Sequence, residues 1–243
     1  MNDIYNLFKQ TRHPIDVSDY WHIFNMSNSL NVVYWNSFFE MARNIPGDIV
    51  ECGVGRGRSL ITILSLESFY RAQPNSTKRK IFALDSFEGF PEPTLEDQSP
   101  RNPKKGEWSI SPNKQFNYSP KALLRIIENC EVPNSTIQDL NIIKGFFSDT
   151  INHISSERIA ILHLDGDLYQ SVKVPLFGLA DKVVPGGIVI IDDYLLVDSE
   201  QSSEPFPGAR LAVEEFLNSR DDFYLNKSIR GTPYLVKKIE QPT

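Results

Sequence analysis

Short apolar segments alternate along the chain with segments of helical periodicity, and this alternation limits the possible folds more than any other feature. The apolar runs predict strands at 48–52, 80–85, 140–145, 159–165 and 186–193. The spacing of apolar residues predicts helices between and after them at 59–70, 119–130, 171–183 and 208–220. Strands that alternate with helices form a parallel sheet with helices on both faces. We therefore expect an α/β fold with a doubly wound, mostly parallel sheet.

The two ends of the chain complete this expectation. The runs DFYLNKSI and PYLVKKIE predict a final pair of short strands, which would add an antiparallel edge and bring the sheet to seven strands. Residues 29–43 have helical spacing, and Pro46-Gly47 ends that helix. We expect residues 1–45 to form an N-terminal helical or lid segment and residues 46–243 to form one domain.

The segment 86–118 does not match the short connections of such folds, which usually have about 2–6 residues. It is rich in Pro, Ser, Asn and Lys, a composition that disordered segments share. It also carries apolar residues that could anchor it, namely Phe90, Trp108, Phe116 and Tyr118. These anchors favour a lid-like insertion over a disordered segment.

Composition excludes several classes of function. The chain has 243 residues and a net charge of −6, so it lacks the basic footprint that nucleic-acid binding requires. Its two cysteines, Cys52 and Cys130, cannot build a disulfide framework. No run of 18 apolar residues is present, and the first residues lack a signal-peptide pattern. We expect a cytoplasmic protein that does not span a membrane and does not bind nucleic acid.

The run ECGVGRG follows the first predicted strand and is a candidate ligand turn. Ligands of open α/β sheets bind at the carboxyl ends of the strands, and glycine lets the backbone approach them closely. Gly53 and Gly55 match a dinucleotide fingerprint, but Arg58 stands where its third glycine belongs. Glu51 would attract an ammonium or sulfonium group rather than a pyrophosphate. The turn therefore favours S-adenosylmethionine (SAM) over NAD, with a purely structural tight turn as the alternative.

Asp85 ends the second predicted strand, about thirty residues after the glycine turn. An acidic side chain in that position can accept the ribose hydroxyls of an adenosine. A turn or capping role explains a single Asp equally well. The combination with the glycine turn favours the ribose contact.

Acidic residues also follow the fourth and fifth predicted strands. Neighbouring parallel strands end at one edge of the sheet, so Asp165, Asp192 and Asp193 are expected to converge there. Carboxylates that lie close together raise one another's pKa unless a cation neutralises them. Mg²⁺ is the expected cation because it prefers oxygen ligands. We interpret Asp167 as the cap of the next helix and His163 as a core residue.

Six blocks carry a resemblance to a known family: VECGVGRGRS, ALDSFEGFPEP, KGFFSDT, LHLDGDLYQS, VPGGIVIIDDY and GARLAVEEF. In this order they closely resemble the macrocin O-methyltransferase (TylF/MycF) family over roughly residues 30–240. The resemblance implies a SAM-dependent class I methyltransferase with a Rossmann-like sheet. It also implies Mg²⁺-dependent methylation of sugar hydroxyls in natural products. The glycine run differs, since many members have G-V-W-R-G-G where this chain has G-V-G-R-G-R.

Carried over by position, the resemblance implies that Asp165, Asp192 and Asp193 hold the metal. It implies two sets of cofactor residues: those that contact SAM (Glu51, Gly53, Ser59, Asp85 and Ser86) and those that line its site (Gly145 and Phe146).

The resulting hypothesis is an O-methyltransferase in which Mg²⁺ activates a sugar hydroxyl and Asp165 takes its proton. One alternative is a glycosyltransferase that uses D-G-D at 165–167 as a metal-binding D-x-D. Another is a binding module of the same fold without catalysis. We expect a small sugar-containing acceptor as partner, and a homo-oligomer to which the aromatic N-terminal segment contributes a contact.

Overall fold

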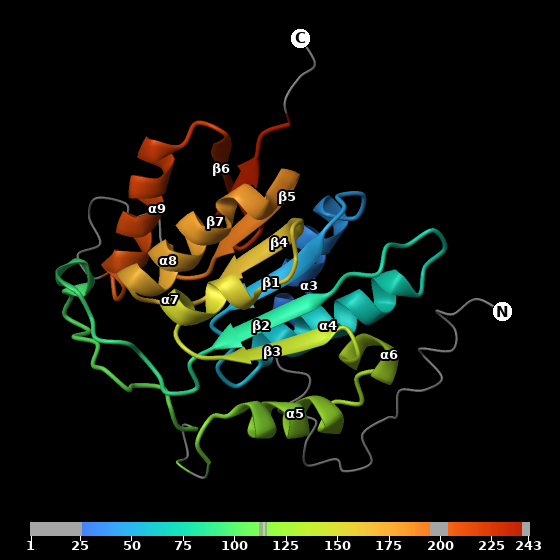
Figure 1. Cartoon of the computed structure of the whole chain (residues 1–243), viewed down its shortest axis with the longest axis horizontal. Helices are drawn as coiled ribbons and strands as arrows, with labels where there is room; N and C mark the ends of the chain where they lie inside the picture. Colours follow the sequence, from blue (N-terminus) through green and yellow to red (C-terminus); the bar gives the residue numbers. More distant parts are fainter. Residues whose placement is uncertain (1–25, 112–113, 115, 195–203, 240–243) are drawn as a thin grey trace.

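The computed structural model describes residues 26–111, 114, 116–194 and 204–239, and these form one seven-stranded sheet between helices (Figure 1). The strand order is β3-β2-β1-β4-β5-β7-β6, and β7 runs antiparallel to both of its neighbours, β5 and β6. The strands are β1 Asp48–Cys52, β2 Ile81–Asp85, β3 Leu140–Lys144, β4 Ile159–Leu164, β5 Val183–Ile191, β6 Phe223–Lys227 and β7 Pro233–Lys237. The expected mostly parallel sheet with an antiparallel C-terminal strand is confirmed. The strand order reverses direction between β1 and β4, which is where such sheets bind ligands.

The helices cover both faces of the sheet and bury its apolar side chains in two clusters. They are α3 Met26–Met41, α4 Arg58–Arg71, α5 Pro120–Asn129, α6 Asn134–Ile137, α7 Phe147–Thr150, α8 Tyr169–Leu179 and α9 Pro207–Ser219. Helices α3, α4 and α5 pack on one face, whereas α8 and α9 pack on the other. Within the described part of the chain, no helix combines the length and apolar character needed to cross a membrane.

The predicted elements agree with the structure to within a few residues. Ser119 caps α5 as expected, because its Oγ accepts the amide N–H of Ala122 at 3.1 Å. Helix α8 begins two residues earlier than expected, and β5 begins three residues earlier. Residues 1–25 lie outside the described residues, so most of the predicted N-terminal segment and its subunit contact stay predictions. Its described helix, α3, buries Trp35 and Phe38 in the core cluster that also holds residues of β1 and α4.

The insertion (residues 86–118) is anchored to the domain through a buried carboxylate. Asp97 ends a 3₁₀ turn, Leu95–Asp97, and its Oδ1 accepts the amide N–H of Tyr169, the first residue of α8, at 2.7 Å. Its Oδ2 accepts the amide N–H of Thr94 at 2.8 Å. Because a buried acceptor satisfies an otherwise free amide at a helix start, this contact stabilises both segments.

We expect Asp97→Ala to lower the free energy of unfolding by about 1–3 kcal/mol, since it leaves buried amides without acceptors. Urea denaturation measures this loss. Asp221→Ala, at an exposed position, is the matched control and should change stability by less than about 0.5 kcal/mol. Equal stability of the two variants would contradict the anchoring role of Asp97.

Candidate functional site

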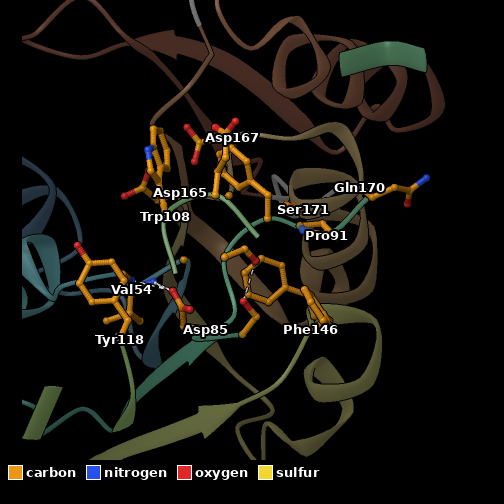
Figure 2. Close-up of a pocket in the computed structure, with 18 of the residues that line it drawn as sticks. Val54, Asp85, Pro91, Trp108, Tyr118, Phe146, Asp165, Asp167, Gln170 and Ser171 are labelled. Atoms are coloured by element: carbon orange, nitrogen blue, oxygen red, sulfur yellow. Dashed lines mark hydrogen bonds between the residues drawn. The ribbon is translucent and has the colours of Figure 1, made fainter. Parts of the chain in front are cut away.

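A cavity of about 670 Å³ lies at the carboxyl ends of β1, β2 and β4 (Figure 2). Its walls come from the glycine turn, from the end of β2, from the start of α8 and from the insertion. The predicted site residues that line it are Gly53, Ser59, Asp85, Ser86, Phe146 and Asp165. The predicted residues Glu51, Gly145, Asp192 and Asp193 do not line it. Seven residues of the insertion do: Ser86, Gly89, Phe90, Pro91, Glu107, Trp108 and Tyr118.

The glycine turn crosses the end of β4 at very short range. Gly53 has a φ of +98°, and a Cβ built on it would overlap the backbone carbonyl oxygen of Asp165. Gly55 has a φ of +51°, but a Cβ there would meet nothing within 4 Å. Gly53 is therefore needed for packing against β4, whereas Gly55 leaves free space beside the cavity that it lines.

Asp85 holds this turn in place. Its Oδ2 accepts the amide N–H groups of Val54 and Gly55 at 2.9 and 2.7 Å, and its Oδ1 accepts that of Phe87 at 2.6 Å. A carboxylate has roughly four acceptor sites, so about one is left for a ligand. Asp85 therefore has the turn role that the sequence suggested, and it also keeps acceptor capacity for about one ribose hydroxyl.

Ser86 and Ser59 line the cavity together with Asp85. The Ser86 hydroxyl donates to the carbonyl oxygen of Gly89 at 2.9 Å and accepts the amide N–H of Glu88 at 3.1 Å. Ser59 lies in the first turn of α4, whose capping residue Gly57 provides no side-chain hydrogen bond. Phe146, just before α7, faces the cavity, whereas its neighbour Gly145 packs against Thr150.

Glu51 is fully buried behind the turn and bound to His163. The His163 Nδ1 lies 3.2 Å from Oε1 of Glu51, and the imidazole packs edge-on against Trp35 with ring centroids 4.7 Å apart. Among the described residues, Oε2 of Glu51 and Nε2 of His163 have no hydrogen-bond partner. His163 is therefore a core residue as expected, but paired with a charge. The contact of Glu51 with a cofactor stays a prediction.

The pair changes the acid–base behaviour of His163. Burial by itself lowers the pKa of His163, but the hydrogen bond and negative charge of Glu51, with smaller contributions from Asp165 and Asp192, raise it to about 9. An imidazolium is thus buried two residues before Asp165. This cation partly offsets the negative charge that collects at the strand ends.

Three carboxylates converge at the ends of β4 and β5. One oxygen from each of Asp165, Asp167 and Asp193 lies within 4.8 Å of the others. Burial and the charges of the neighbouring carboxylates raise the pKa of all three side chains. Asp193 also accepts the amide N–H of Asp167 at 3.1 Å. A partly buried group of oxygen ligands with raised pKa values suits a hard divalent cation.

The fourth carboxylate, Asp192, is not in this group. Its Oδ1 pairs with the Arg230 guanidinium at 3.1 Å, and the guanidinium lies over the Tyr34 ring at 4.9 Å. Asp167, in contrast, does not cap α8: the residue at the capping position is Leu168, and the α8 amide of Tyr169 is bound by Asp97. The expected convergence thus holds for Asp165 and Asp193, and Asp167 takes the place expected for Asp192.

Sequence reasoning missed Asp167 as a member of the carboxylate group. The D-G-D pattern contained the signal, since two Asp residues separated by one residue follow a strand end. A capping role looked sufficient because a helix begins there. The backbone of Asp167 has a φ of +60°, a left-handed conformation that no pattern in the sequence indicated. Gln170 and Ser171 of α8 also line the cavity; they end the block LHLDGDLYQS, but nothing in the sequence assigned either of them a role.

The family model and the relatives that match this chain are all O-methyltransferases. The family model described as macrocin O-methyltransferase (TylF) matches residues 39–221. The chain is 33% identical over 156 residues, 64% of its length, to the 8-demethyl-8-(2,3-dimethoxy-α-L-rhamnosyl)-tetracenomycin-C 4′-O-methyltransferase of Streptomyces olivaceus. It is 29% identical over 172 residues, 71% of its length, to the mycinamicin III 3″-O-methyltransferase of Micromonospora griseorubida. The matches span 56% and 61% of these two relatives.

A solved structure has the same fold along almost the whole chain. The calicheamicin methyltransferase CalS11 superposes with a TM-score of 0.70, and the match covers 97% of this chain and 91% of that one. Sequence identity in this match is 21%, so the likeness concerns the fold alone.

Two alanine substitutions separate packing from backbone strain in the glycine turn. Both glycines have positive φ, so each alanine costs about 1–2 kcal/mol in strain. Gly53→Ala also places a methyl group on the Asp165 carbonyl, and we expect it to lose at least about 2 kcal/mol more than Gly55→Ala. Chemical denaturation of both variants measures the difference. Equal losses would show that the close contact is not required.

The stability of the metal-free protein should fall between about pH 6.5 and pH 9. The folded pKa of His163, about 9, exceeds its ordinary value of 6.5, so the folded protein binds the proton more tightly. The stabilisation is complete below pH 6.5 and is lost as the pH rises through 9. We expect a loss of up to about 3 kcal/mol. Denaturation in EDTA at several pH values measures it.

The raised pKa values of the neighbouring aspartates act in the same direction, so the His163 contribution needs a matched comparison. His163→Gln should give a flatter dependence on pH, whereas His153→Gln, at an exposed position, should keep the slope of the original protein. An unchanged slope in His163→Gln would contradict the assignment.

Proposed function

The chain belongs to the macrocin O-methyltransferase (TylF) family, and on this premise we propose that it transfers the methyl group of SAM to a hydroxyl of a sugar. The acceptor is a small sugar-containing molecule, either a glycosylated natural product or a nucleotide sugar, and Mg²⁺ assists the reaction. One relative is named as a methyltransferase of a rhamnosyl-tetracenomycin, and the other as a methyltransferase of mycinamicin III. This chain spans only part of their length, so its own activity is proposed from its site.

One observation carries the proposal: a single cavity connects the glycine turn and Asp85 with the carboxylates Asp165 and Asp167. In Figure 2, Asp85 and Phe146 lie at one end of the view, and Asp165 and Asp167 lie at the other. A cofactor bound at the first end and an acceptor bound at the second would meet inside one enclosed space. A glycosyltransferase would use the carboxylates but would leave the glycine turn without a role.

The residues at the first end fit SAM. The free space beside Gly55 lets a ligand approach the backbone, and Asp85 keeps capacity for about one ribose hydroxyl. Ser59 and Ser86 add hydroxyl groups to the same wall, and the Phe146 ring offers an apolar surface for an adenine. We propose that these residues, with Gly53, bind the cofactor. Gly145 positions Phe146, and Glu51 acts from behind the turn.

The carboxylates at the second end fit Mg²⁺ as a donor set. Asp165 and Asp193 are common to the set predicted from sequence and to the group that converges in the structure. We propose Asp192 as the third ligand, because its bond to Arg230 is partly exposed, and such ion pairs contribute only about 0–1 kcal/mol. A bound cation can replace a partner held that weakly. Asp167 is the alternative third ligand.

The reaction proposed for this site balances without further reactants. A divalent cation at the carboxylates supplies positive charge that lowers the pKa of an acceptor hydroxyl. Asp165, which lines the cavity and has a raised pKa, takes the hydroxyl proton. The oxygen attacks the methyl carbon, the bond from carbon to the sulfonium sulfur breaks, and S-adenosylhomocysteine leaves. The walls of the cavity contribute mainly by holding the two reactants in line.

The direct test uses the purified protein, methyl-labelled SAM and a panel of acceptors. The panel contains mycinamicin III, a rhamnosylated tetracenomycin and TDP-rhamnose, each with Mg²⁺ or with EDTA. We expect label in one acceptor class, no label in EDTA and recovery when Mg²⁺ is restored. Cofactor binding measured by calorimetry without any label transfer across the panel would count against the proposed acceptors. Transfer that persists in EDTA would exclude the role of Mg²⁺.

Two matched substitutions identify the third metal ligand. Asp192→Asn should weaken Mg²⁺ binding at least about tenfold, because it removes a ligand charge. Asp167→Asn should weaken it less and should leave the affinity for S-adenosylhomocysteine within about twofold. Isothermal titration with Mg²⁺ and with S-adenosylhomocysteine measures both values. The reverse order of the two metal affinities would assign Asp167 as the ligand.

A further inference from the structure

We propose that Trp108 presents the face of its indole to the sugar ring of the acceptor and so sets which hydroxyl reaches the reacting methyl group. This inference rests on the proposed function and concerns the acceptor end of the same cavity. Trp108 is a positioning residue in this account, since it would hold the sugar without taking part in proton or methyl transfer.

The backbone that carries Trp108 is fixed by the pairing of two parts of the insertion. The amide N–H of Phe90 donates to the carbonyl oxygen of Glu107 at 3.0 Å, and that of Gly106 donates to the carbonyl oxygen of Phe90 at 2.9 Å. Gly89 makes this approach possible, because a Cβ there would overlap the Glu107 carbonyl oxygen. The residue before Trp108 is thus held by backbone hydrogen bonds.

The side chain of Glu107 adds a second support. Its carboxylate accepts the guanidinium of Arg101 at 2.5 Å and the amide N–H of Lys104 at 3.0 Å. The same guanidinium lies 5.4 Å from the ring centroid of Trp108 and 5.3 Å from that of Phe206. Arg101 therefore links the insertion to the segment that precedes α9, with the indole as one of its contacts.

Aromatic packing fixes the orientation of the indole. The ring centroids of Trp108 and Phe90 are 4.9 Å apart, and those of Trp108 and Phe206 are 5.8 Å apart. Phe90 and Phe206, with Leu168, form a small hydrophobic cluster separate from the two main clusters of the core. The indole thus packs against a hydrophobic cluster that joins the insertion to the starts of α8 and α9.

The indole is only partly covered by these contacts. Trp108 is 53% exposed and lines the cavity. Its φ is +64°, a left-handed conformation that is rare for a bulky residue and costs on the order of 1–3 kcal/mol. Strained residues of this kind cluster at functional sites, where the strain fixes a side chain toward a ligand. Here the strained residue displays an aromatic ring to a cavity.

The position of the ring indicates the acceptor rather than the cofactor. Figure 2 shows Trp108 at the end of the view that holds Asp165 and Asp167, away from Asp85 and Phe146. The proposed proton acceptor and the indole therefore face the same part of the cavity. A molecule that stacks on Trp108 would present its edge to the carboxylates.

The chemistry of a sugar ring matches this arrangement. A pyranose has hydroxyl groups around its edge and C–H groups on its faces, so an aromatic ring can cover a face while polar groups bind the edge. Phe90 and Pro91 continue the apolar wall beside Trp108. Carboxylates at the edge and an indole at the face would together select one ring orientation, and hence one hydroxyl.

The test measures sugar binding and turnover in matched variants. Saturation-transfer NMR in the presence of S-adenosylhomocysteine uses methyl α-L-rhamnopyranoside and TDP-rhamnose as probes. We expect transfer to ring C–H protons in the original protein, a weaker signal in Trp108→Phe, and none in Trp108→Ala. With an acceptor from the labelled panel, Trp108→Ala should raise KM about tenfold and change kcat by less than threefold. Trp108→Phe should recover part of the loss.

Phe206→Leu is the control for a purely structural role, because it weakens the same aromatic cluster at a residue that does not line the cavity. It should raise KM by at most about threefold, less than Trp108→Ala, because Phe90 still packs against the indole. Equal effects of Phe206→Leu and Trp108→Ala on KM, or no transfer from the original protein to either probe, would overturn the proposal. Calorimetry with S-adenosylhomocysteine tests the proposed function separately, since failure to bind it would refute that function whatever Trp108 does.

Discussion

The contact between the Gly53 backbone and the end of β4 determines the geometry of the whole site. The amide N–H of Asp165 donates to the carbonyl oxygen of Cys52 at 2.9 Å, and that of Gly53 donates to the carbonyl oxygen of Leu84 at 2.9 Å. The ends of three strands are thus joined, and the close contact leaves no room for a Cβ at Gly53. The proposed cofactor end and the acidic end of the cavity are therefore parts of one rigid sheet edge rather than of separate loops.

Several carboxylates lie at the same edge of the sheet, and positively charged side chains pair with only some of them. The Glu51–His163 pair places an imidazolium beneath the strand ends, and Arg230 pairs with Asp192 from the β6–β7 turn. Asp165, Asp167 and Asp193 form no ion pair within the described part of the chain, and burial together with their mutual repulsion raises their pKa values. A site with unbalanced buried carboxylates is poorly stabilised without a ligand, and this is a common property of functional sites.

The fold and most of the cavity could be predicted because both depend on patterns local in sequence. Alternating strands and helices determine a parallel sheet, and residues that follow parallel strands must meet at its edge. This reasoning placed Gly53, Asp85 and Asp165 correctly in the cavity wall. It expected Asp192 rather than Asp167 in the converging group, because the left-handed backbone of Asp167 and the pairing of Asp192 with an arginine some forty residues away have no local pattern. It also could not find the Glu51–His163 pair, which forms across two strands.

Because Asp97 anchors the insertion, the wall of the cavity that the insertion forms can vary between related proteins. The buried carboxylate binds the first amide of α8, while Glu107, Trp108 and Tyr118, which follow it in the insertion, line the cavity. Changes in length or sequence beyond the anchor can therefore reshape the wall without loosening the helix that begins next to Asp167. A lineage of such proteins could exchange one acceptor for another by altering this stretch, and an engineer could graft it between relatives in the same way.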